Sequence, residues 1–121
     1  MLAVGIDSLD IVRMQKYVDN RKFLNKFFTP YEIEYCNLTV NKTMRMAGLY
    51  CAKEAFVKAL GIGLGGGIPL NEIEIKHDKK GKPFLNLSPL AKKKVLILGY
   101  TEWDVSITHT HTCSTAVCVL N

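Results

Sequence analysis

Residues 42–61 read KTMRMAGLYCAKEAFVKALG and predict the longest helix of the chain. The run contains no proline and a single interior glycine, Gly48, so it predicts a helix over residues 42–60 with Gly61 as its C-cap. The segment Ala47–Ala52 is small and apolar on almost every side. We therefore expect this helix to be buried on most of its surface.

The flanking segments predict short strands and shorter helices. Before the long helix we expect a strand at 1–7, a helix from about Leu9 to Val18, a helical piece through Phe23–Phe28, and a helix that opens with the capping box Thr29-Pro30-Tyr31-Glu32 and ends near Cys36–Leu38. After it we expect a hairpin over 73–87, a helix from Ser88-Pro89 to Gly99, and two antiparallel strands, Trp103–Thr108 and Thr115–Leu120. This order predicts one α+β domain over residues 1–121, with a small antiparallel sheet packed against one long helix and shorter helices.

Composition limits the class of protein. A chain of 121 residues has room for one core, and no apolar run approaches the length of a membrane span. The N-terminus reaches Asp7 without a basic segment, so we do not interpret it as a signal peptide. The four cysteines form no CxxC pair and lie in apolar surroundings, which indicates reduced core thiols and a cytoplasmic protein.

The net charge of +5 is concentrated in two segments. Residues 10–26 carry five basic side chains against two acidic ones, and residues 76–94 carry seven lysines against Asp78. Clustered positive charge favours an anionic partner, such as a nucleic acid, a phosphate-bearing molecule or an acidic protein. For Lys92–Lys94 we prefer a solvated surface.

Lys53 and Glu54 are the main candidates for chemistry, because they interrupt the apolar middle of the long helix. Lys58 follows Glu54 by one turn, a spacing that stabilises helices, so a solvated charged stripe is the competing interpretation. A carboxylate in apolar surroundings favours a cation, and one or two carboxylates suit Mg²⁺. Asp7, at the end of the first strand, fits either a metal ligand or a helix N-cap, and on its own spacing we favour the cap.

Two further segments remain ambiguous. The glycine-rich run 61–69 follows a helix, so it does not match a dinucleotide fingerprint or a P-loop; it is either a ligand-binding loop or a flexible turn. His109, His111 and Cys113 are spaced by two and would share one face of a strand. Zinc binding is the less favoured interpretation because no fourth ligand is evident, and phosphate binding suits a histidine flanked by hydroxyls at least as well.

Five ordered blocks resemble the holo-acyl-carrier-protein synthases, the short class of 4′-phosphopantetheinyl transferases. Residues 5–14 are similar to the family's G-x-D-I-V-E-I-x-R-I, and residues 23–32 to F-x-x-R-x-F-T-x-x-E. Residues 47–61 are similar to A-G-R-F-A-A-K-E-A-x-x-K-A-L-G, residues 81–83 match G-K-P, and residues 106–110 match S-I-T-H-T. The blocks cover most of the chain in the family's order.

The resemblance implies an enzyme that moves the phosphopantetheine arm of coenzyme A to a serine of an acyl carrier protein and releases adenosine 3′,5′-bisphosphate. Asp7 and Glu54 would hold Mg²⁺ against the pyrophosphate, and Glu54 would organise loss of the serine proton. Lys53 and Lys58 would supply positive charge to phosphate oxygens.

The resemblance also implies where coenzyme A and the carrier bind. His109 would lie near the 3′-phosphate of coenzyme A. The residues expected to line the coenzyme A cleft are Arg45, Lys53, Lys58, Gly61, Gly63, Gly65, Ile68, Lys82, Pro83, His109 and Thr110. The residues expected to dock the acidic carrier are Arg13, Lys16, Arg21 and Lys22.

In this family three subunits form a ring with a cleft between neighbours, so a homotrimer is expected, with neither nucleic acid nor membrane as partner. The chain departs from the family pattern at three places. Leu49 replaces a phosphate-binding arginine, for which Arg45 is a candidate substitute one turn earlier; Ser8-Leu9 replaces Ile-Val; and Asp10 replaces Glu. The carrier that is modified and the acceptance of acyl-coenzyme A are not predicted.

Two other classes of function compete with the transferase. A basic binding module would dock an acidic partner or nucleic acid without chemistry, and Glu54→Gln would then leave binding intact. A zinc protein would use His109, His111 and Cys113 and would contain zinc when purified.

Overall fold

The computed structural model describes residues 1–62 and 67–121. The first half of the chain contains β1 (Ala3–Asp10), α1 (Ile11–Met14), α2 (Arg21–Phe27), α3 (Pro30–Asn37) and α4 (Lys42–Leu60). The second half contains the short 3₁₀ turn η1 (Leu70–Glu72), β2 (Ile73–His77), β3 (Pro83–Leu87), α5 (Pro89–Ile97), β4 (Trp103–His109) and β5 (Cys113–Leu120). This order confirms the predicted α+β class.

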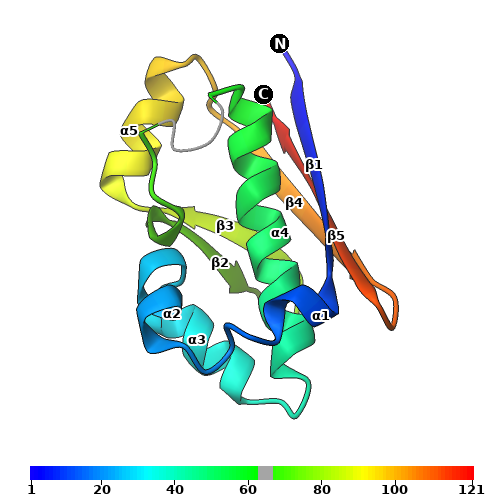
Figure 1. Cartoon of the computed structure of the whole chain (residues 1–121). Coiled ribbons are helices and arrows are strands. Elements are labelled where there is room, and N and C mark those ends of the chain that lie inside the picture. Colours follow the sequence, from blue (N-terminus) through cyan, green and yellow to red (C-terminus); the bar gives the residue numbers. More distant parts are fainter. Residues whose placement is uncertain (63–66) are drawn as a thin grey trace.

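The strands form two antiparallel sheets. β1, β5 and β4 make a three-stranded sheet in that order, and β2 pairs with β3 in a separate hairpin. Helix α4 runs along the three-stranded sheet, with the β2–β3 hairpin on its other side and α1, α2 and α3 around its N-terminal end (Figure 1). Both chain termini lie near the other end of α4 (Figure 1).

Helix α4 has the predicted bounds and is the centre of the core. Twelve of its nineteen residues are buried, including Phe56, Ala52 and Leu49. Its C-cap, Gly61, has a φ of 72°, the left-handed conformation that glycine adopts without a Cβ clash. The helix is buried on several sides, and its small residues allow the strands to pack closely against it.

The N-terminal prediction was wrong in detail. The first strand extends to Asp10, and the helix expected from Leu9 to Val18 is only the single turn Ile11–Met14. Asp7 lies inside the strand, opposite Ala116 of β5, so it does not cap a helix. Pairing along the whole length of β5 keeps these residues extended, which local helical spacing cannot reveal.

The capping box at the start of α3 is present as predicted, and Glu32 does more than cap the helix. The Thr29 hydroxyl accepts from Glu32 N at 3.3 Å, and Glu32 accepts from Thr29 N at 2.9 Å. The same carboxylate accepts from Ile75 N at 2.8 Å and pairs with Lys53 at 2.6 Å, with both charged side chains fully buried. Glu32 therefore joins α3, the β2–β3 hairpin and α4 at one point.

Gly5 permits the closest contact between β1 and α4. A Cβ at this position would overlap the Ala55 carbonyl oxygen and would lie 2.6 Å from Ala59 N. Any side chain here would push the strand off the helix, and with it Asp7, two residues further along the same face.

Among the described residues, no helix is both long enough and apolar enough to cross a membrane.

We expect Lys53→Met to lower the free energy of unfolding by about 3–5 kcal/mol, because it leaves the Glu32 carboxylate buried without its cation. Urea denaturation followed by circular dichroism measures this change. Lys42→Met is the matched control: Lys42 pairs with the exposed Asp19, and its loss should cost less than about 1 kcal/mol. Equal losses in both variants would contradict the role given to the buried pair.

We expect Gly5→Ala to lower the free energy of unfolding by about 3 kcal/mol or more. Overpacking a core usually costs about 1–3 kcal/mol, and here the obstructing atoms belong to the helix backbone. Ser8→Ala, on the exposed face of the same strand, should change stability by less than about 1 kcal/mol, through loss of its bond to Thr115. Thermal unfolding of the two variants tests the difference, and a Gly5→Ala protein as stable as wild type would refute the close-contact argument.

Candidate active site between β1 and α4

Asp7, Glu54 and Lys58 meet where β1 crosses α4. Asp7 points from the inner face of β1 toward the helix, where Lys58 Nζ lies 2.9 Å from its carboxylate and 3.1 Å from the Ile6 carbonyl oxygen. Glu54 lies one helical turn before Lys58 and is half-buried. The ion pair of Lys58 is therefore with Asp7 across the strand–helix contact, where the sequence had suggested a pairing with Glu54 along the helix.

The pKa of Glu54 depends on the groups around it. Burial raises the pKa of Glu54 and the nearby Asp7 charge raises it further, whereas the Tyr50 hydroxyl and Lys58 lower it. Burial and the Asp7 charge also raise the pKa of the adjacent Cys51 thiol, to about 12, so this cysteine stays protonated. Lys58 is half-exposed, with its pKa raised through its bond to Asp7.

Asp7 and Glu54 fit a hard divalent cation. Burial and the Asp7 charge disfavour the ionised form of Glu54, so added positive charge stabilises this group, and Lys58 supplies a single positive charge. Mg²⁺ is commonly bound by one or two carboxylates that leave its remaining positions to water and phosphate oxygens. Among the described residues no cluster of three or more His, Cys, Asp or Glu is placed to hold a metal ion, and a cation at this contact would have Asp7 and Glu54 as its carboxylate ligands.

Aromatic side chains adjoin the acidic group. Tyr50, on α4, contacts Phe23 and Phe27 of α2 with ring centroids 6.4 and 6.0 Å apart. Tyr17 stacks on Phe23 at 4.1 Å. All four rings are half-buried, so they present a partly exposed apolar wall beside Glu54.

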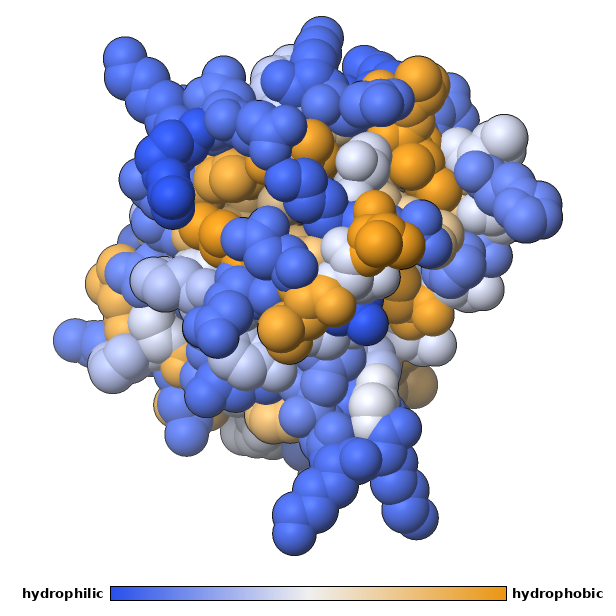
Figure 2. All heavy atoms as spheres, turned by 90° about the horizontal axis from the view of Figure 1, so that it is seen from below, coloured by the Kyte–Doolittle hydropathy of each residue, from blue (hydrophilic) through white to orange (hydrophobic). Residues whose placement is uncertain are grey.

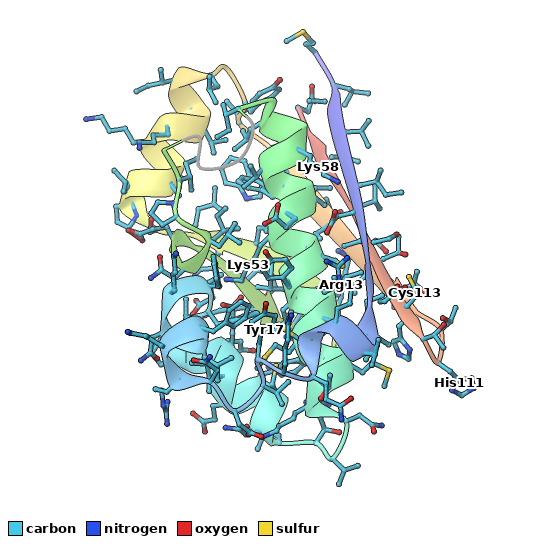
Figure 3. The ribbon with its side chains drawn as sticks, viewed as in Figure 1. Arg13, Tyr17, Lys53, Lys58, His111 and Cys113 are labelled. Atoms are coloured by element: carbon cyan, nitrogen blue, oxygen red, sulfur yellow. The ribbon has the colours of Figure 1, made fainter. Side chains whose placement is uncertain are left out.

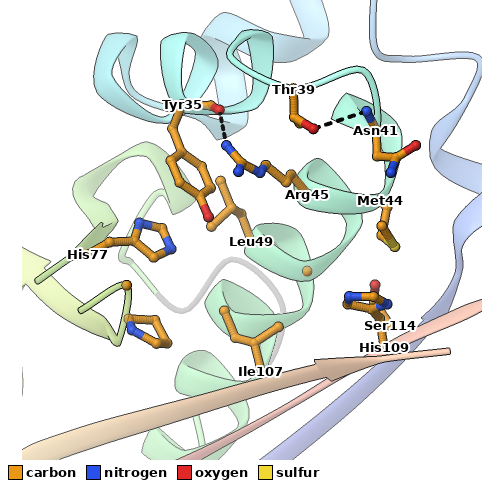
Figure 4. Close-up of a pocket in the computed structure, with 13 residues that line it drawn as sticks. Tyr35, Thr39, Asn41, Met44, Arg45, Leu49, His77, Ile107, His109 and Ser114 are labelled. Carbon is orange, nitrogen blue, oxygen red and sulfur yellow. Dashed lines mark hydrogen bonds between the residues drawn. The ribbon is translucent and has the colours of Figure 1, made fainter. Parts of the chain in front are cut away.

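A pocket of about 370 Å³ opens on the other side of α4 (Figure 4). Its walls come from the α3–α4 segment, the helix itself, the β2–β3 turn and the ends of β4 and β5. The described residues that line it are Tyr35, Thr39, Asn41, Met44, Arg45, Gly48, Leu49, His77, Gly81, Pro83, Ile107, His109 and Ser114.

The acidic group and the pocket lie on opposite sides of α4. Arg45 and Glu54 are nine positions apart, as are Leu49 and Lys58, and nine residues are about two and a half turns of an ideal helix. None of Asp7, Glu54 and Lys58 lines the pocket. Within one chain the structure therefore brings the predicted binding residues together as two separate groups.

Lys53 belongs to neither group. Its side chain is fully buried, and its three donors are used by Glu32, by the Leu70 carbonyl at 2.9 Å and by the Ile73 carbonyl at 2.7 Å. Lys58 projects toward β1, whereas Lys53 projects toward β2 (Figure 3). No donor of Lys53 is left for a phosphate, and the structure gives this lysine a role in the core instead.

The remaining predicted cleft residues are spread over several segments. Gly63 and Gly65 lie outside the described residues, while Gly61 is exposed at the end of α4 and Ile68 is buried. Lys82 is half-exposed and bonds Asp104 at 3.0 Å, which lowers the pKa of that carboxyl.

His109 is the last residue of β4, and Thr110 begins the turn to β5. His109 lines the pocket, and the Thr110 hydroxyl accepts from Cys113 N at 3.1 Å. Residues 110–112 form the turn, with His111 at its far end, His109 at the end of β4 and Cys113 at the start of β5, so these three side chains do not share one strand face (Figure 3). With no three-residue metal cluster among the described residues, the zinc interpretation has no support.

The four predicted docking residues are exposed on α1, α2 and the turn between them. They are Arg13, Lys16, Arg21 and Lys22. Figure 2 views the molecule from the end where these helices lie and shows apolar side chains among a hydrophilic rim. The exposed apolar residues of α1 and the α3–α4 loop include Val12, Leu38 and Val40.

Sequence reasoning missed the pocket residues Tyr35, His77 and Ser114. Tyr35 lies on the capped helix α3, and His77 ends an alternating strand, so a contact between the two depended on the tertiary packing of α3 on β2. The chain gave no local signal for Ser114, which directly precedes the last predicted strand, Thr115–Leu120.

Comparison with known proteins identifies the family of the chain. The family model of the 4′-phosphopantetheinyl transferase superfamily matches residues 3–116. A holo-acyl-carrier-protein synthase of Syntrophus aciditrophicus is 41% identical over 118 residues, which cover 96% of this chain and 92% of that protein. One from Halothermothrix orenii is 40% identical over 108 residues, covering 88% of this chain and 86% of that protein.

Solved structures of the same enzymes share the fold. The holo-acyl-carrier-protein synthase of Helicobacter pylori in complex with coenzyme A superposes with a TM-score of 0.86 at 33% identity, covering 98% of this chain and 99% of that one. The enzyme from Bacillus anthracis in complex with CoA (3′,5′-ADP) gives 0.80 at 30% identity, covering 98% and 94%. The chain therefore belongs to the 4′-phosphopantetheinyl transferase superfamily, together with these holo-acyl-carrier-protein synthases.

Proposed function

We propose that this chain transfers the 4′-phosphopantetheine arm of coenzyme A to a serine of an apo-acyl carrier protein in a Mg²⁺-dependent reaction. The observation that carries the proposal is the contact of Asp7 with Lys58 beside Glu54, in a chain of this family. Two carboxylates and a lysine at a half-exposed strand–helix contact can bind a pyrophosphate together with its cation.

The transfer forms one bond and breaks one. The serine Oγ attacks the phosphorus that carries the pantetheine arm, and the bridging P–O bond of the pyrophosphate breaks. Adenosine 3′,5′-bisphosphate leaves with the electron pair of that bond. Glu54 takes the serine proton, a role suited to a carboxylate whose pKa is raised by burial and by Asp7. Lys58 donates to the phosphate oxygens on which negative charge increases.

Asp7 and Glu54 are the residues that would hold Mg²⁺. The bound ion would neutralise charge on the pyrophosphate as the leaving group departs. Gly5 sets the position of Asp7 on the helix, and Lys58 orients its carboxylate.

The pocket across α4 is proposed to bind the nucleotide end of a coenzyme A molecule whose pyrophosphate is bound by Asp7 and Glu54 of a neighbouring copy of the chain. In one chain the pocket and the acidic group face apart, so a single ligand reaches both only if one copy supplies Asp7 and Glu54 and the next supplies the pocket. The outer face of β1 exposes Val4 and Ile6, at 68% and 61%, as an apolar surface that a second copy can cover. A homotrimer closes such head-to-tail contacts into a ring.

The basic residues of α1 and α2 are proposed to dock the acidic carrier. Arg13 and Lys16 lie on the segment that follows β1 directly, so a carrier bound there brings its serine toward Asp7. Exposed charges of this kind raise the rate of encounter and fix orientation more than they add affinity. A cytoplasmic location stays a prediction from the sequence.

Purified protein with coenzyme A, Mg²⁺ and an apo-carrier should yield a carrier heavier by the phosphopantetheine arm in intact-mass spectrometry. Glu54→Gln and Asp7→Asn should lower the rate by about 10²–10⁴-fold, while the exposed Glu34→Gln on α3 serves as the matched control. A chelator should abolish transfer, and added Mg²⁺ should restore it. If folded wild-type protein modifies none of several apo-carriers, the proposed function is wrong.

A site shared between copies predicts complementation. Glu54→Gln removes the acid from one copy, and His109→Glu places a carboxylate in the pocket of another, so each variant alone should be nearly inactive. When the two variants are co-expressed, a mixed oligomer contains sites that combine the unchanged pocket of the Glu54→Gln copy with the unchanged Glu54 of the His109→Glu copy. Activity should return at these sites. No recovery in verified mixed oligomers would show that each chain works alone.

Ile6→Lys should separately reduce the oligomer to monomers in light scattering and lower activity.

A further inference from the structure

Glu54 is the less firmly held of the two acids at the candidate active site. Asp7 has a partner, because Lys58 Nζ lies 2.9 Å from its carboxylate. Glu54 is half-buried, yet among the described residues no Lys, Arg or His nitrogen lies within ion-pair distance of it. A glutamate side chain also has one more rotatable bond than an aspartate, so it loses more rotamer freedom when it is fixed. A carboxylate that must meet a cation and a serine proton in one geometry therefore needs another means of support.

Tyr50 lies one helical turn before Glu54 on α4 and supplies this support. Residues four apart on a helix share a face, and helical side chains tilt toward the N-terminus, so the Glu54 side chain leans toward Tyr50. The two side chains are hydrogen-bonded, and this is the only side-chain hydrogen bond of Glu54 among the described residues. The tyrosine hydroxyl donates, so one carboxylate oxygen is engaged and the other is left free.

The ring of Tyr50 packs among three phenylalanines from α2 and its C-terminal end. The Tyr50 ring centroid lies 6.4 Å from that of Phe23, 6.0 Å from that of Phe27 in an edge-on arrangement, and 6.4 Å from that of Phe28. Phe28 is only 2% exposed, and Phe23 stacks in turn on Tyr17 at 4.1 Å. Aromatic pairs favour particular angles and distances, so this cluster fixes where the Tyr50 hydroxyl lies.

The hydroxyl belongs to this chain and not to the motif that its helix resembles. In A-G-R-F-A-A-K-E-A the position of Tyr50 is a phenylalanine, so the ring is expected and the oxygen is an addition. A ring alone would complete the aromatic cluster. A half-buried hydroxyl needs a hydrogen-bond partner, and the Glu54 carboxylate is the partner it has. The contact with Glu54 is therefore what the added oxygen contributes.

We propose that Tyr50 is the positioning residue of Glu54: the phenylalanine cluster holds its ring, and its hydroxyl holds the carboxylate in one orientation beside Asp7. The inference rests on the proposed function for the roles of Glu54, which would hold Mg²⁺ with Asp7 and take the serine proton. With one oxygen engaged by Tyr50, the carboxylate offers its second oxygen without reorganising as the substrates bind. Each acid then has one neighbour that orients it, Lys58 for Asp7 and Tyr50 for Glu54.

Tyr50→Phe removes the hydroxyl and keeps the ring, so it tests the contact with Glu54 alone. Steady-state transfer at saturating Mg²⁺ should show kcat lower by about 5- to 20-fold, with KM for coenzyme A and for the apo-carrier within about 2-fold of wild type. Tyr100→Phe is the matched control, because it removes a hydroxyl from another half-buried tyrosine, which follows α5 and lies outside the candidate active site. Its kcat should equal that of wild type.

Cation binding gives a second readout that needs no transfer. Mn²⁺ stands in for Mg²⁺, and the electron paramagnetic resonance signal of the free ion reports its binding to protein with coenzyme A and no carrier, with coenzyme A alone as the blank. Tyr50→Phe should weaken Mn²⁺ binding by about 3- to 10-fold, and Tyr100→Phe should leave it unchanged. Urea denaturation checks that both variants are folded.

The phenylalanine cluster has its own variant. Phe23→Leu leaves the Tyr50 hydroxyl in place but removes a ring that packs against Tyr50, so Mn²⁺ binding should weaken by about 2- to 5-fold. In the Tyr50→Phe background the same change should have no further effect, because no hydroxyl is left to be misplaced. This double-mutant cycle separates positioning of the hydroxyl from a direct effect of α2 on the site.

Three results would overturn the inference: a Tyr50→Phe protein with wild-type kcat and Mn²⁺ affinity, a loss confined to KM for the carrier, or additive effects of Tyr50→Phe and Phe23→Leu on Mn²⁺ binding. Failure of the proposed function is seen separately. A protein whose Mn²⁺ affinity depends on Tyr50 but which modifies no carrier would leave the positioning role standing and remove the transferase. An active protein that is indifferent to Tyr50→Phe would do the reverse.

Discussion

Helix α4 is enclosed by the two sheets and the N-terminal helices, and this enclosure determines what its polar residues can do. A charged group on a buried helix needs a partner, because desolvation penalises its ionised form. Lys53 meets the requirement inside the protein through Glu32 and two carbonyl oxygens. Glu54 meets it only in part, since burial and Asp7 raise its pKa and a single half-exposed lysine lies nearby. Adjacent positions on one helix thus separate into a structural pair and an incomplete, ligand-ready group.

The distance between β1 and α4 turns that incomplete group into a site. Without a side chain at Gly5, the strand lies directly on the helix backbone near Ala55 and Ala59. Asp7, two residues further along, then reaches Lys58 at 2.9 Å. A strand displaced by the width of a methyl group would carry the carboxylate away from Glu54, so the position of the Asp7 carboxylate depends on a residue that has no side chain.

The sequence predicted those features that local patterns encode. The bounds of α4, its glycine C-cap, the capping box and the β2–β3 hairpin depend on residues close together in the chain, and all are present. The fold class and the family were also predicted correctly. The first strand was predicted too short, because its last three residues are extended only through pairing with β5, more than a hundred residues away. Lys53 could not be separated from Glu54 by pattern alone: the two are neighbours in sequence, and only the position of the Glu32 carboxylate shows which one is enclosed.

The two-sided arrangement of α4 links assembly to specificity. The acidic group and the pocket are about two and a half turns apart along α4, which places them on opposite faces of the helix, so no small rearrangement within one chain brings them together. If a neighbouring copy completes each site, the exposed apolar face of β1 becomes part of catalysis, because it sets how the pocket of one copy meets the acids of the next. In that arrangement Leu49, where the resemblance predicts an arginine, adds no charge to the pocket, and the positive charge on this face of α4 comes from Arg45. A guanidinium one turn earlier on the same face, ordered by Tyr35, offers the charge to the same pocket from a neighbouring position.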